Sequence, residues 1–274
     1  MTLPLLNIEN LSLSLGKTSS SYQILKDISF RIYPGEIVGL VGESGCGKSL
    51  TASAILGLLP PLSQLTGYIE FEGQNLIKHI SSLRGTRLSL ILQDPSLALN
   101  PLIPIGRQLI EGLCYHKKMS RKAAVKIGTE WLDRVGISDA STRMRQYPHE
   151  MSGGMKQRIL IAIALICQPS LLIADEPTTA LDVTIQAQIL DLLQNLQKEK
   201  GMSLLLITHD LGIIARCCQR VMVMYAGQLV ETGPVEQVLT SPRHPYTQAL
   251  LQSRRSLAQV RDQSLICLEG KLGY

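Results

Sequence analysis

The chain has 274 residues, of which 45% are hydrophobic and 18% charged, a composition that excludes a disordered chain or a peptide-sized scaffold. Its length suits one large domain, or one domain with a smaller insert. Lys and Arg outnumber Asp and Glu by 27 to 22, a formal net charge of +5, and only 4% of residues are aromatic, so a base-stacking surface for nucleic acid is poorly supported.

The cysteines and the apolar runs predict where the protein resides. Six cysteines are scattered without the close pairing of a metal site, and the N-terminus lacks the basic-then-apolar pattern of a signal segment. No apolar run approaches the length of about 18 residues that spans a bilayer. We therefore expect a cytosolic protein with reduced thiols and, at most, a peripheral role at a membrane.

The first part of the chain is expected to form antiparallel strands and then a strand, a loop and a helix. Apolar and polar residues alternate over 5–15 and 28–32, which predicts strands that are buried on one face. An almost wholly apolar run over 36–41 leads into a glycine-rich loop. Residues 49–59 then have helical character, and we expect Pro60 and Pro61 to stop this helix.

The region between about 93 and 151 is expected to be a helical insert. One helix is predicted over 105–115, and a second begins after Ser120 as its N-cap and ends at Gly136. Strands and helices then alternate again, which predicts a parallel sheet. Helices are expected over 152–167, 184–198, 211–217 and 234–239, and strands over 171–174, 204–208, 221–225 and 228–232.

A phosphate-binding loop is predicted between the strand at 36–41 and the helix that follows it. The segment matches the pattern GxxxxGK followed by Ser or Thr, and its residues are Gly42, Glu43, Ser44, Gly45, Cys46, Gly47, Lys48 and Ser49. Glycines let successive N–H groups turn toward phosphate oxygens, Lys48 can reach the β- and γ-phosphates, and the Ser49 hydroxyl can ligate Mg²⁺. A simple glycine-rich turn does not explain why Lys and Ser follow the last glycine together.

Two carboxylates follow the apolar strand at 171–174. Asp175 can hold Mg²⁺ through water, and Glu176 is the better candidate to polarise an attacking water, because phosphoryl transfer otherwise needs mainly electrostatic stabilisation. Taken alone, an acidic pair at a strand end is commonly a helix cap. Its position in the same chain as a phosphate loop favours the catalytic interpretation.

Residues 151–158, with the sequence MSGGMKQR, closely resemble the signature motif of ATP-binding cassette (ABC) proteins. Gln93 matches the Q-loop of that family, 180–182 match its D-loop, and His209 matches its switch histidine. The resemblance covers about 5–251 and implies an α/β P-loop NTPase fold with a mixed RecA-like core, an N-terminal antiparallel β-subdomain and an inserted α-helical subdomain. The implied boundaries are an ABC ATPase domain over 1–251, with the insert at about 94–165, and a short C-terminal extension over 252–274.

The resemblance also implies roles for individual residues toward ATP and Mg²⁺. Gln93 would sense Mg²⁺ and the attacking water, and His209 would contact the γ-phosphate and orient Glu176. The signature residues Ser152, Gly153 and Gly154, together with Asp182 of the D-loop, would complete the nucleotide site of a partner subunit. Backbone N–H groups at the start of the signature helix suit this role, because they form a second anion site.

The residue that stacks on adenine is the least determined part of the site. Relatives often carry an aromatic residue where this sequence has Leu15. Tyr22 is a possible substitute, although an aromatic side chain there could equally pack on the sheet.

Three segments are similar to one group within the family. Met155 replaces the Gln of the wider signature, and SGGM is similar to the ATPases of dipeptide, oligopeptide and nickel importers. The segments 173–184 and 244–247 (HPYT) resemble the same group. The implied function is the ATP-hydrolysing subunit of a peptide importer, with nickel as an alternative cargo.

The implied partners are integral-membrane permease subunits, a second ABC ATPase, and indirectly an extracytoplasmic substrate-binding protein. The second ATPase is expected to be a different chain, with a homodimer as the alternative, and the implied location is the cytoplasmic face of the inner membrane. One rival is a non-transport ABC protein that acts on nucleic acid, but twin cassettes, long coiled coils and zinc-bearing inserts are missing from the sequence. Another rival, a P-loop kinase or GTPase, is disfavoured by the signature segment and by His209.

Overall fold

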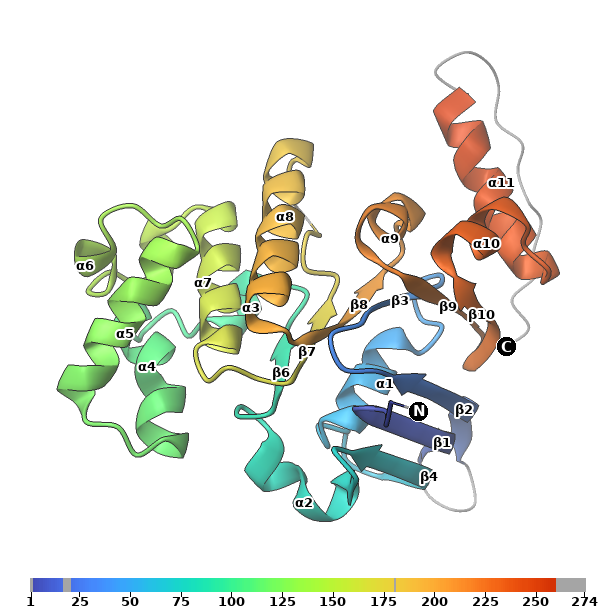
Figure 1. Ribbon diagram of the computed structural model, residues 1–274, viewed down its shortest axis with the longest axis horizontal. Helices are drawn as coiled ribbons and strands as arrows, with labels where there is room; N and C mark the ends of the chain where they lie inside the picture. The colour runs from blue at the N-terminus through green and yellow to red at the C-terminus, as the bar shows by residue number, and fades with distance from the viewer. Residues whose placement is uncertain (1, 17–20, 180, 260–274) are drawn as a thin grey trace.

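Two β-sheets organise the computed structural model, which describes residues 2–16, 21–179 and 181–259 (Figure 1). Ala180 of the predicted D-loop and residues 260–274 of the predicted extension lie outside the described residues. The first sheet is antiparallel, with the order β2-β1-β4-β5. Its strands are β1 (Leu6–Leu15), β2 (Tyr22–Ile32), β4 (Ser63–Phe71) and β5 (Gln74–Asn75).

The second sheet is mixed and has the order β10-β9-β3-β8-β7-β6. Its strands are β3 (Ile37–Val41), β6 (Leu88–Ile91), β7 (Leu171–Asp175), β8 (Ser203–Thr208), β9 (Arg220–Tyr225) and β10 (Gln228–Pro234). Neighbouring strands run parallel except for the edge pair of β9 and β10. Every residue of β3, β7 and β8 is buried, as expected for central parallel strands that are covered on both faces.

Helices flank the mixed sheet, and several of them gather beyond its β6 edge (Figure 1). In chain order they are α1 (Lys48–Ile55), α2 (Leu76–Leu83), α3 (Pro95–Ala98), α4 (Ile105–His116), α5 (Arg121–Arg134), α6 (Ala140–Arg143), the 3₁₀ helix η1 (Pro148–Glu150), α7 (Gly153–Leu165), α8 (Val183–Lys200), α9 (Leu211–Cys217), α10 (Val235–Thr240) and α11 (Pro245–Gln259).

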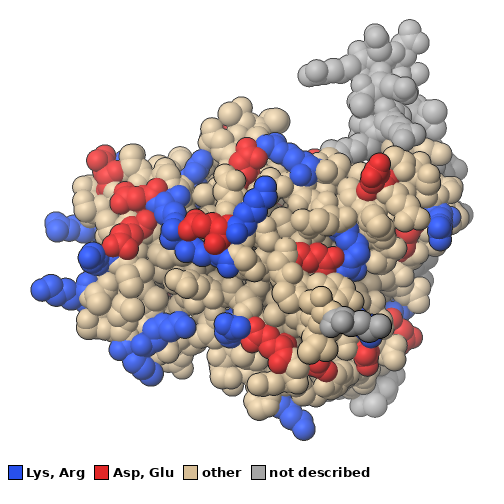
Figure 2. Space-filling view, in the orientation of Figure 1, with Lys and Arg blue, Asp and Glu red and all other residues tan. Residues whose placement is uncertain are grey.

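Separate hydrophobic cores form on the two faces of the mixed sheet. One core joins β3, β7 and β8 to the antiparallel sheet and α1, and the other joins the opposite face to α4, α5, α7 and α8. On the face shown in Figure 2, acidic and basic side chains are interspersed, so the net charge of +5 is not gathered into one basic surface there.

This architecture confirms the predicted fold class, a mixed α/β core with an antiparallel β-sheet and added helices. Ser120 caps α5 by accepting a hydrogen bond from the Ala123 N–H at 3.4 Å. Gly136 follows the C-cap of α5 with φ of 78°, as the sequence predicted. In contrast, β4, β5, α2 and β6 were not expected from the sequence, and β2 begins at Tyr22 rather than at Ile28.

The end of α1 also differs from the prediction. The helix stops at Ile55, before the two prolines, and Gly57 follows with φ of 63°. The Leu58 N–H donates to the Ser53 carbonyl at 2.8 Å, and the Gly57 N–H donates to the Ala54 carbonyl at 3.2 Å. These two bonds form a Schellman motif. Gly57 therefore ends the helix, and the prolines only follow it.

Candidate functional site

The phosphate loop lies between β3 and α1, where the chain leaves the middle of the mixed sheet. Gly47 precedes α1 with φ of 111°, in a region of backbone conformation that favours glycine. A Cβ atom at Gly47 would lie 2.7 Å from Leu25 Cδ2, and a Cβ atom at Gly42 would clash with the Met224 carbonyl oxygen. The loop therefore needs glycine at both positions, as the motif predicts.

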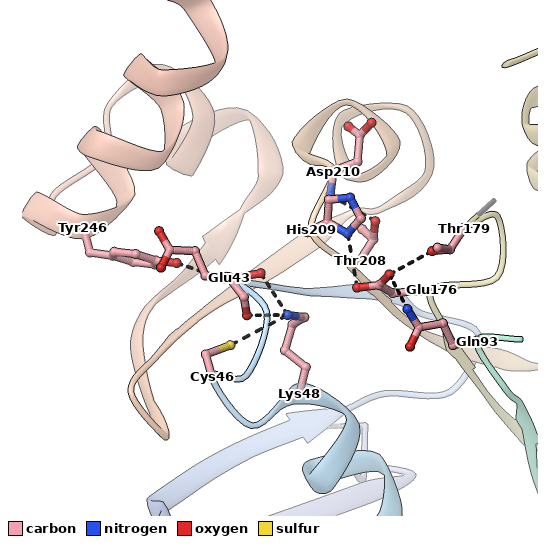
Figure 3. A network of polar contacts seen from close by, with 11 residues as sticks. Glu43, Cys46, Lys48, Gln93, Glu176, Thr179, Thr208, His209, Asp210 and Tyr246 are labelled. Atoms are coloured by element: carbon pink, nitrogen blue, oxygen red, sulfur yellow. Dashed lines mark hydrogen bonds and ion pairs between the residues drawn. The ribbon is translucent and has the colours of Figure 1, made fainter. Parts of the chain in front are cut away.

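Lys48 is buried and points back into its own loop. Its Nζ atom lies 2.9 Å from the Gly42 carbonyl oxygen and 2.8 Å from that of Glu43 (Figure 3). The ammonium group is thus held at the centre of the loop by carbonyl oxygens, which phosphate oxygens can replace. Neighbouring Cys46 is also buried, and burial raises the pKa of its thiol despite the nearby Lys48 charge.

Asp175 ends β7 and is 7% exposed. Burial raises the pKa of its carboxyl group, although a hydrogen bond with Ser49 acts in the opposite direction. Its Oδ1 atom is buried without a hydrogen-bond partner. An unpaired buried carboxylate oxygen beside a serine hydroxyl fits the oxygen ligands that Mg²⁺ prefers.

Glu176 is the centre of a polar network at the end of β7 (Figure 3). Its Oε2 atom accepts hydrogen bonds from Thr179 Oγ1 at 2.8 Å and from Gln93 Nε2 at 3.1 Å, and Oε1 lies 3.1 Å from His209 Nδ1. Burial raises the pKa of Glu176, but the hydrogen bonds of Thr179 and His209 outweigh it, and the pKa lies below its ordinary value. The carboxylate is therefore ionised at neutral pH.

The backbone positions this network on neighbouring strands. Glu176 has φ of 46°, and its N–H donates to the Ile207 carbonyl of β8 at 2.9 Å. His209 follows β8 directly, and the next residue, Asp210, caps α9 by accepting from the Gly212 N–H at 2.7 Å. Since β7 and β8 are parallel neighbours, their carboxyl ends bring Glu176 and His209 together.

One pocket combines the phosphate loop with the polar network. The residues that line it are Ser44, Gly45, Gly47, Lys48, Ser49, Leu50, Gln93 and Glu176. All of these residues except Leu50 were predicted from the sequence to contact nucleotide, metal or water. The lining does not include the predicted Gly42, Glu43, Cys46, Asp175, His209 and Tyr22, nor Asp182 and the signature residues, which were expected to serve the site of a partner subunit.

The signature segment and the D-loop form a separate unit. Ser152 caps α7, and its hydroxyl accepts from the Met155 N–H at 3.3 Å. Asp182 caps α8 and accepts from the Ile185 N–H at 2.9 Å. A Cβ atom at Gly154 would lie 3.0 Å from Ile185 Cγ2, so the starts of α7 and α8 pack closely and leave no room for a side chain there.

Tyr22 lies at the start of β2, paired with Leu15 of β1, and is 73% exposed. It packs on neither face of the sheet core and does not line the pocket. Its stacking on adenine stays a prediction.

Two residues with polar contacts at the site were missed from the sequence. Thr179, three residues after Glu176, donates to that carboxylate. Tyr246 accepts a hydrogen bond from the backbone N–H of Glu43, at 3.0 Å. Thr179 follows the carboxylate pair closely enough to have been a candidate. Glu43 and Tyr246 differ by 203 in residue number, a separation that leaves no local signal of their contact.

The mixed sheet, the phosphate loop and the strand-end carboxylates define a P-loop ATPase of the ATP-binding cassette class. The family model of the ABC transporter matches residues 25–179, and the chain belongs to this family. A second family model, described as the C-terminal region of oligopeptide/dipeptide transporters, matches residues 230–272.

Named relatives and solved structures agree with this assignment. The dipeptide transport ATP-binding protein DppD of Bacillus subtilis is 50% identical over 254 residues, which cover 90% of this chain and 76% of the relative. DppD of Escherichia coli is 45% identical over 264 residues, which cover 94% of this chain and 81% of the relative. Among solved structures, the dimeric post-hydrolysis state of the ATP-binding cassette MJ0796 bound to ADP and Pi matches with a TM-score of 0.74 at 25% sequence identity. The match covers 84% of this chain and 98% of the MJ0796 chain.

Proposed function

We propose that the chain is the ATP-hydrolysing subunit of an ABC importer that takes up peptides. The observation that carries this proposal is the pocket in which Glu176, held by its neighbours, faces the phosphate loop. The relatives whose names specify dipeptide or oligopeptide transport support the cargo, as does the matched C-terminal family model. No observation favours nickel or a nucleic-acid substrate.

The phosphate loop would bind ATP through its backbone N–H groups and Lys48. The N–H groups at the start of α1 and the Lys48 ammonium group attract the β- and γ-phosphates. Ser49 and Asp175 would hold Mg²⁺, since the unpaired Asp175 oxygen needs a partner. When bound, the ion neutralises charge on the β- and γ-phosphate oxygens. Gln93, which also lines the pocket, would sense this ion and the attacking water.

Glu176 would polarise the attacking water. Its lowered pKa keeps the carboxylate able to accept a proton at neutral pH. Thr179, Gln93 and His209 fix the orientation of the two carboxylate oxygens, so that little reorganisation is needed at the moment of reaction. His209 is 63% exposed, and it can therefore also contact a γ-phosphate.

A second subunit would complete the site. Ser152, Gly153 and Gly154 lie at a helix start outside the pocket of their own chain, where their N–H groups can bind the γ-phosphate held by a partner. Asp182 adjoins them at the start of α8. We expect the partner to be a related but different ATPase chain, with a homodimer as the alternative.

The remaining partners would be membrane permease subunits and, indirectly, an extracytoplasmic substrate-binding protein. Leu92, Leu97 and Leu102 are 48%, 86% and 83% exposed within one short stretch after β6. These three exposed leucines lie in the same segment as Gln93, which lines the pocket, so a permease helix that docked on them would be close along the chain to a residue of the site. Within the described part of the chain, no helix is long and apolar enough to cross a membrane. The chain would bind at the cytoplasmic face of the inner membrane.

The test is uptake in proteoliposomes that contain the permease, the binding protein and both ATPases. We expect ATP-dependent uptake of labelled dipeptides or oligopeptides, with the wild-type chain but not with Glu176→Gln. Uptake of Ni²⁺ in place of peptides would support the alternative cargo. ATP hydrolysis that neither cargo stimulates would contradict the importer function.

A further inference from the structure

The start of α11 contacts the phosphate loop directly. The Glu43 N–H donates to the phenol oxygen of Tyr246 at 3.0 Å (Figure 3). The same peptide group carries the Gly42 carbonyl, which accepts from Lys48 Nζ at 2.9 Å. The two ends of a trans peptide point in opposite directions. The first peptide of the loop is thus held by the phosphate lysine at one end and by Tyr246 at the other.

The Tyr246 ring packs against the end of β9 in the mixed sheet. Its centroid lies 4.4 Å from that of Tyr225, with an interplanar angle of 37°. Val41 pairs with Val223 in the parallel register of β3 and β9, so Tyr225 is level with Glu43. Burial raises the pKa of Tyr246 to about 12, and the side chain therefore stays a neutral phenol at physiological pH.

The residues around Tyr246 fix where α11 begins. Two backbone N–H groups, of Arg243 and His244, donate to the Glu231 carboxylate of β10 at 2.8 and 3.1 Å. The His244 Nδ1 atom accepts from the Tyr246 N–H at 3.2 Å, and Pro245 is the first residue of the helix, a position that proline favours. The HPYT segment thus caps a helix and aims one phenol at the loop.

The opposite side of the loop is held as well. The Gly227 N–H, in the turn between β9 and β10, donates to the Cys46 carbonyl at 3.0 Å. Both contacts come from the last part of the described chain. Once phosphates replace the carbonyl partners of Lys48, the inner contact to the Gly42 carbonyl is lost. The Tyr246 contact then remains to fix the Gly42–Glu43 peptide.

We infer that Tyr246 is a positioning residue for nucleotide binding, which holds the first peptide of the phosphate loop in its binding conformation. This inference rests on the proposed binding of ATP by that loop. A loop fixed before binding loses less conformational entropy when the ligand arrives. Because the contact does not involve the transferred phosphoryl group, it stabilises ground state and transition state equally, and such an interaction lowers KM without changing kcat.

The test is Tyr246→Phe in the full chain, which removes the phenol oxygen and keeps the ring on Tyr225. We expect ATP affinity, measured by calorimetry, to fall roughly 3- to 10-fold, the effect of one lost hydrogen bond. In the assembled complex, KM for ATP should rise by a similar factor while kcat stays unchanged. Hydrogen exchange at the Glu43 amide should become faster. The matched control is Tyr33→Phe, which removes a phenol oxygen beyond the opposite end of β3.

Tyr246→Phe affinity equal to or above that of the wild type would overturn the inference. So would an equal loss in Tyr33→Phe, or a fall in kcat at constant KM. Failure of the proposed function is a different result, because it would appear in the wild-type chain, either as no binding of ATP or as ATP hydrolysis that no cargo stimulates.

Discussion

Lys48 has hydrogen-bond partners in the loop both without and with bound phosphates. In the structure its ammonium group donates hydrogen bonds to the Gly42 and Glu43 carbonyls, and charged phosphate oxygens are stronger partners for the same group. Lys48→Ala should weaken ATP binding about 10- to 100-fold, the range for a charged hydrogen-bonding group, and abolish turnover. Titration with a fluorescent ATP analogue measures this effect, with Lys198→Ala, an exposed lysine of α8, as the control. Wild-type affinity in Lys48→Ala would contradict the phosphate-loop assignment.

Glu176→Gln separates binding from hydrolysis. The amide keeps the shape of the carboxylate but cannot take a proton from water, so hydrolysis should fall by roughly 100-fold or more while ATP affinity is retained. A closed dimer with bound ATP should accumulate, which light scattering detects. Glu199→Gln, at an exposed site on α8, controls for the loss of one negative charge. Hydrolysis at the wild-type rate would show that another group activates the water.

Cys46 gives a prediction with a defined dependence on pH. Burial raises the pKa of its thiol, so the reactive thiolate is scarcer at any given pH than for an ordinary cysteine. Iodoacetamide at pH 7.5 should therefore modify Cys46 far more slowly in the folded protein than after denaturation, and the rate should rise with pH. Mass spectrometry of peptides after timed quenching measures both rates. Equal rates in the two states would mean that the loop is open to the reagent.

At the residue scale, the sequence predicted the polar groups better than their contacts. Lys48 and Ser49 could be predicted from a short motif, because they directly follow the loop in the sequence and their positions relative to its backbone depend only on neighbouring residues. Glu176 could be predicted for the same reason, as it follows an apolar strand. The contact between Tyr246 and Glu43 could not be predicted, because it depends on the register of β9 beside β3 and on the cap of α11. The resemblance placed Ser152 and Asp182 away from the nucleotide pocket of their own chain, but the close packing of Gly154 on Ile185 could not be predicted.

At the scale of elements, the end of α1 illustrates competing stop signals. Gly57 and the prolines lie within four residues, and the left-handed conformation of Gly57 ends the helix first. Gly57→Ala should destabilise the protein by about 1–2 kcal/mol, the cost of a Cβ in this conformation, and its Cβ would also press on Ile80 at 3.2 Å. Urea denaturation measures the change. Pro61→Ala is the control and should destabilise the protein less than Gly57→Ala. A larger destabilisation by Pro61→Ala would show that the prolines end the helix.

Two of the elements missed from the sequence, β4 and α2, lie largely at the surface. In β4, seven of nine residues are exposed or half-buried, so the strand carries little alternation. In α2, Leu76 is the one buried residue among eight. Both are short surface elements that exist because β1 and the first core offer them an edge and a face. These elements are stabilised by tertiary contacts, which cannot be predicted from the helix or strand propensity of their own residues.

At the scale of the whole molecule, the proposed shared site can be tested from the signature helix. Ser152→Arg places a bulky cation at the start of α7 and leaves the phosphate loop of the same chain intact. ATP binding should persist while dimer closure and hydrolysis fail. The control is Ser120→Arg, which removes an equivalent serine cap from α5 and should cost similar stability without blocking hydrolysis. Rates are measured against protein concentration, with and without the partner and permease. Activity proportional to concentration in monomeric samples, and retained in Ser152→Arg, would exclude a shared site.

The order of strands in the mixed sheet has a consequence for synthesis. Strand β3, which leads into the phosphate loop, is made early, but its neighbours β8 and β9 cover Ser203–Thr208 and Arg220–Tyr225. A nascent chain that has emerged only as far as α8 therefore holds every residue of the loop and neither of the strands that support it. Contacts of such long sequence separation form late. We therefore expect ATP to stabilise this protein during synthesis only after β8 and β9 have emerged, because until then the apolar strand β3 lacks its neighbours in the sheet.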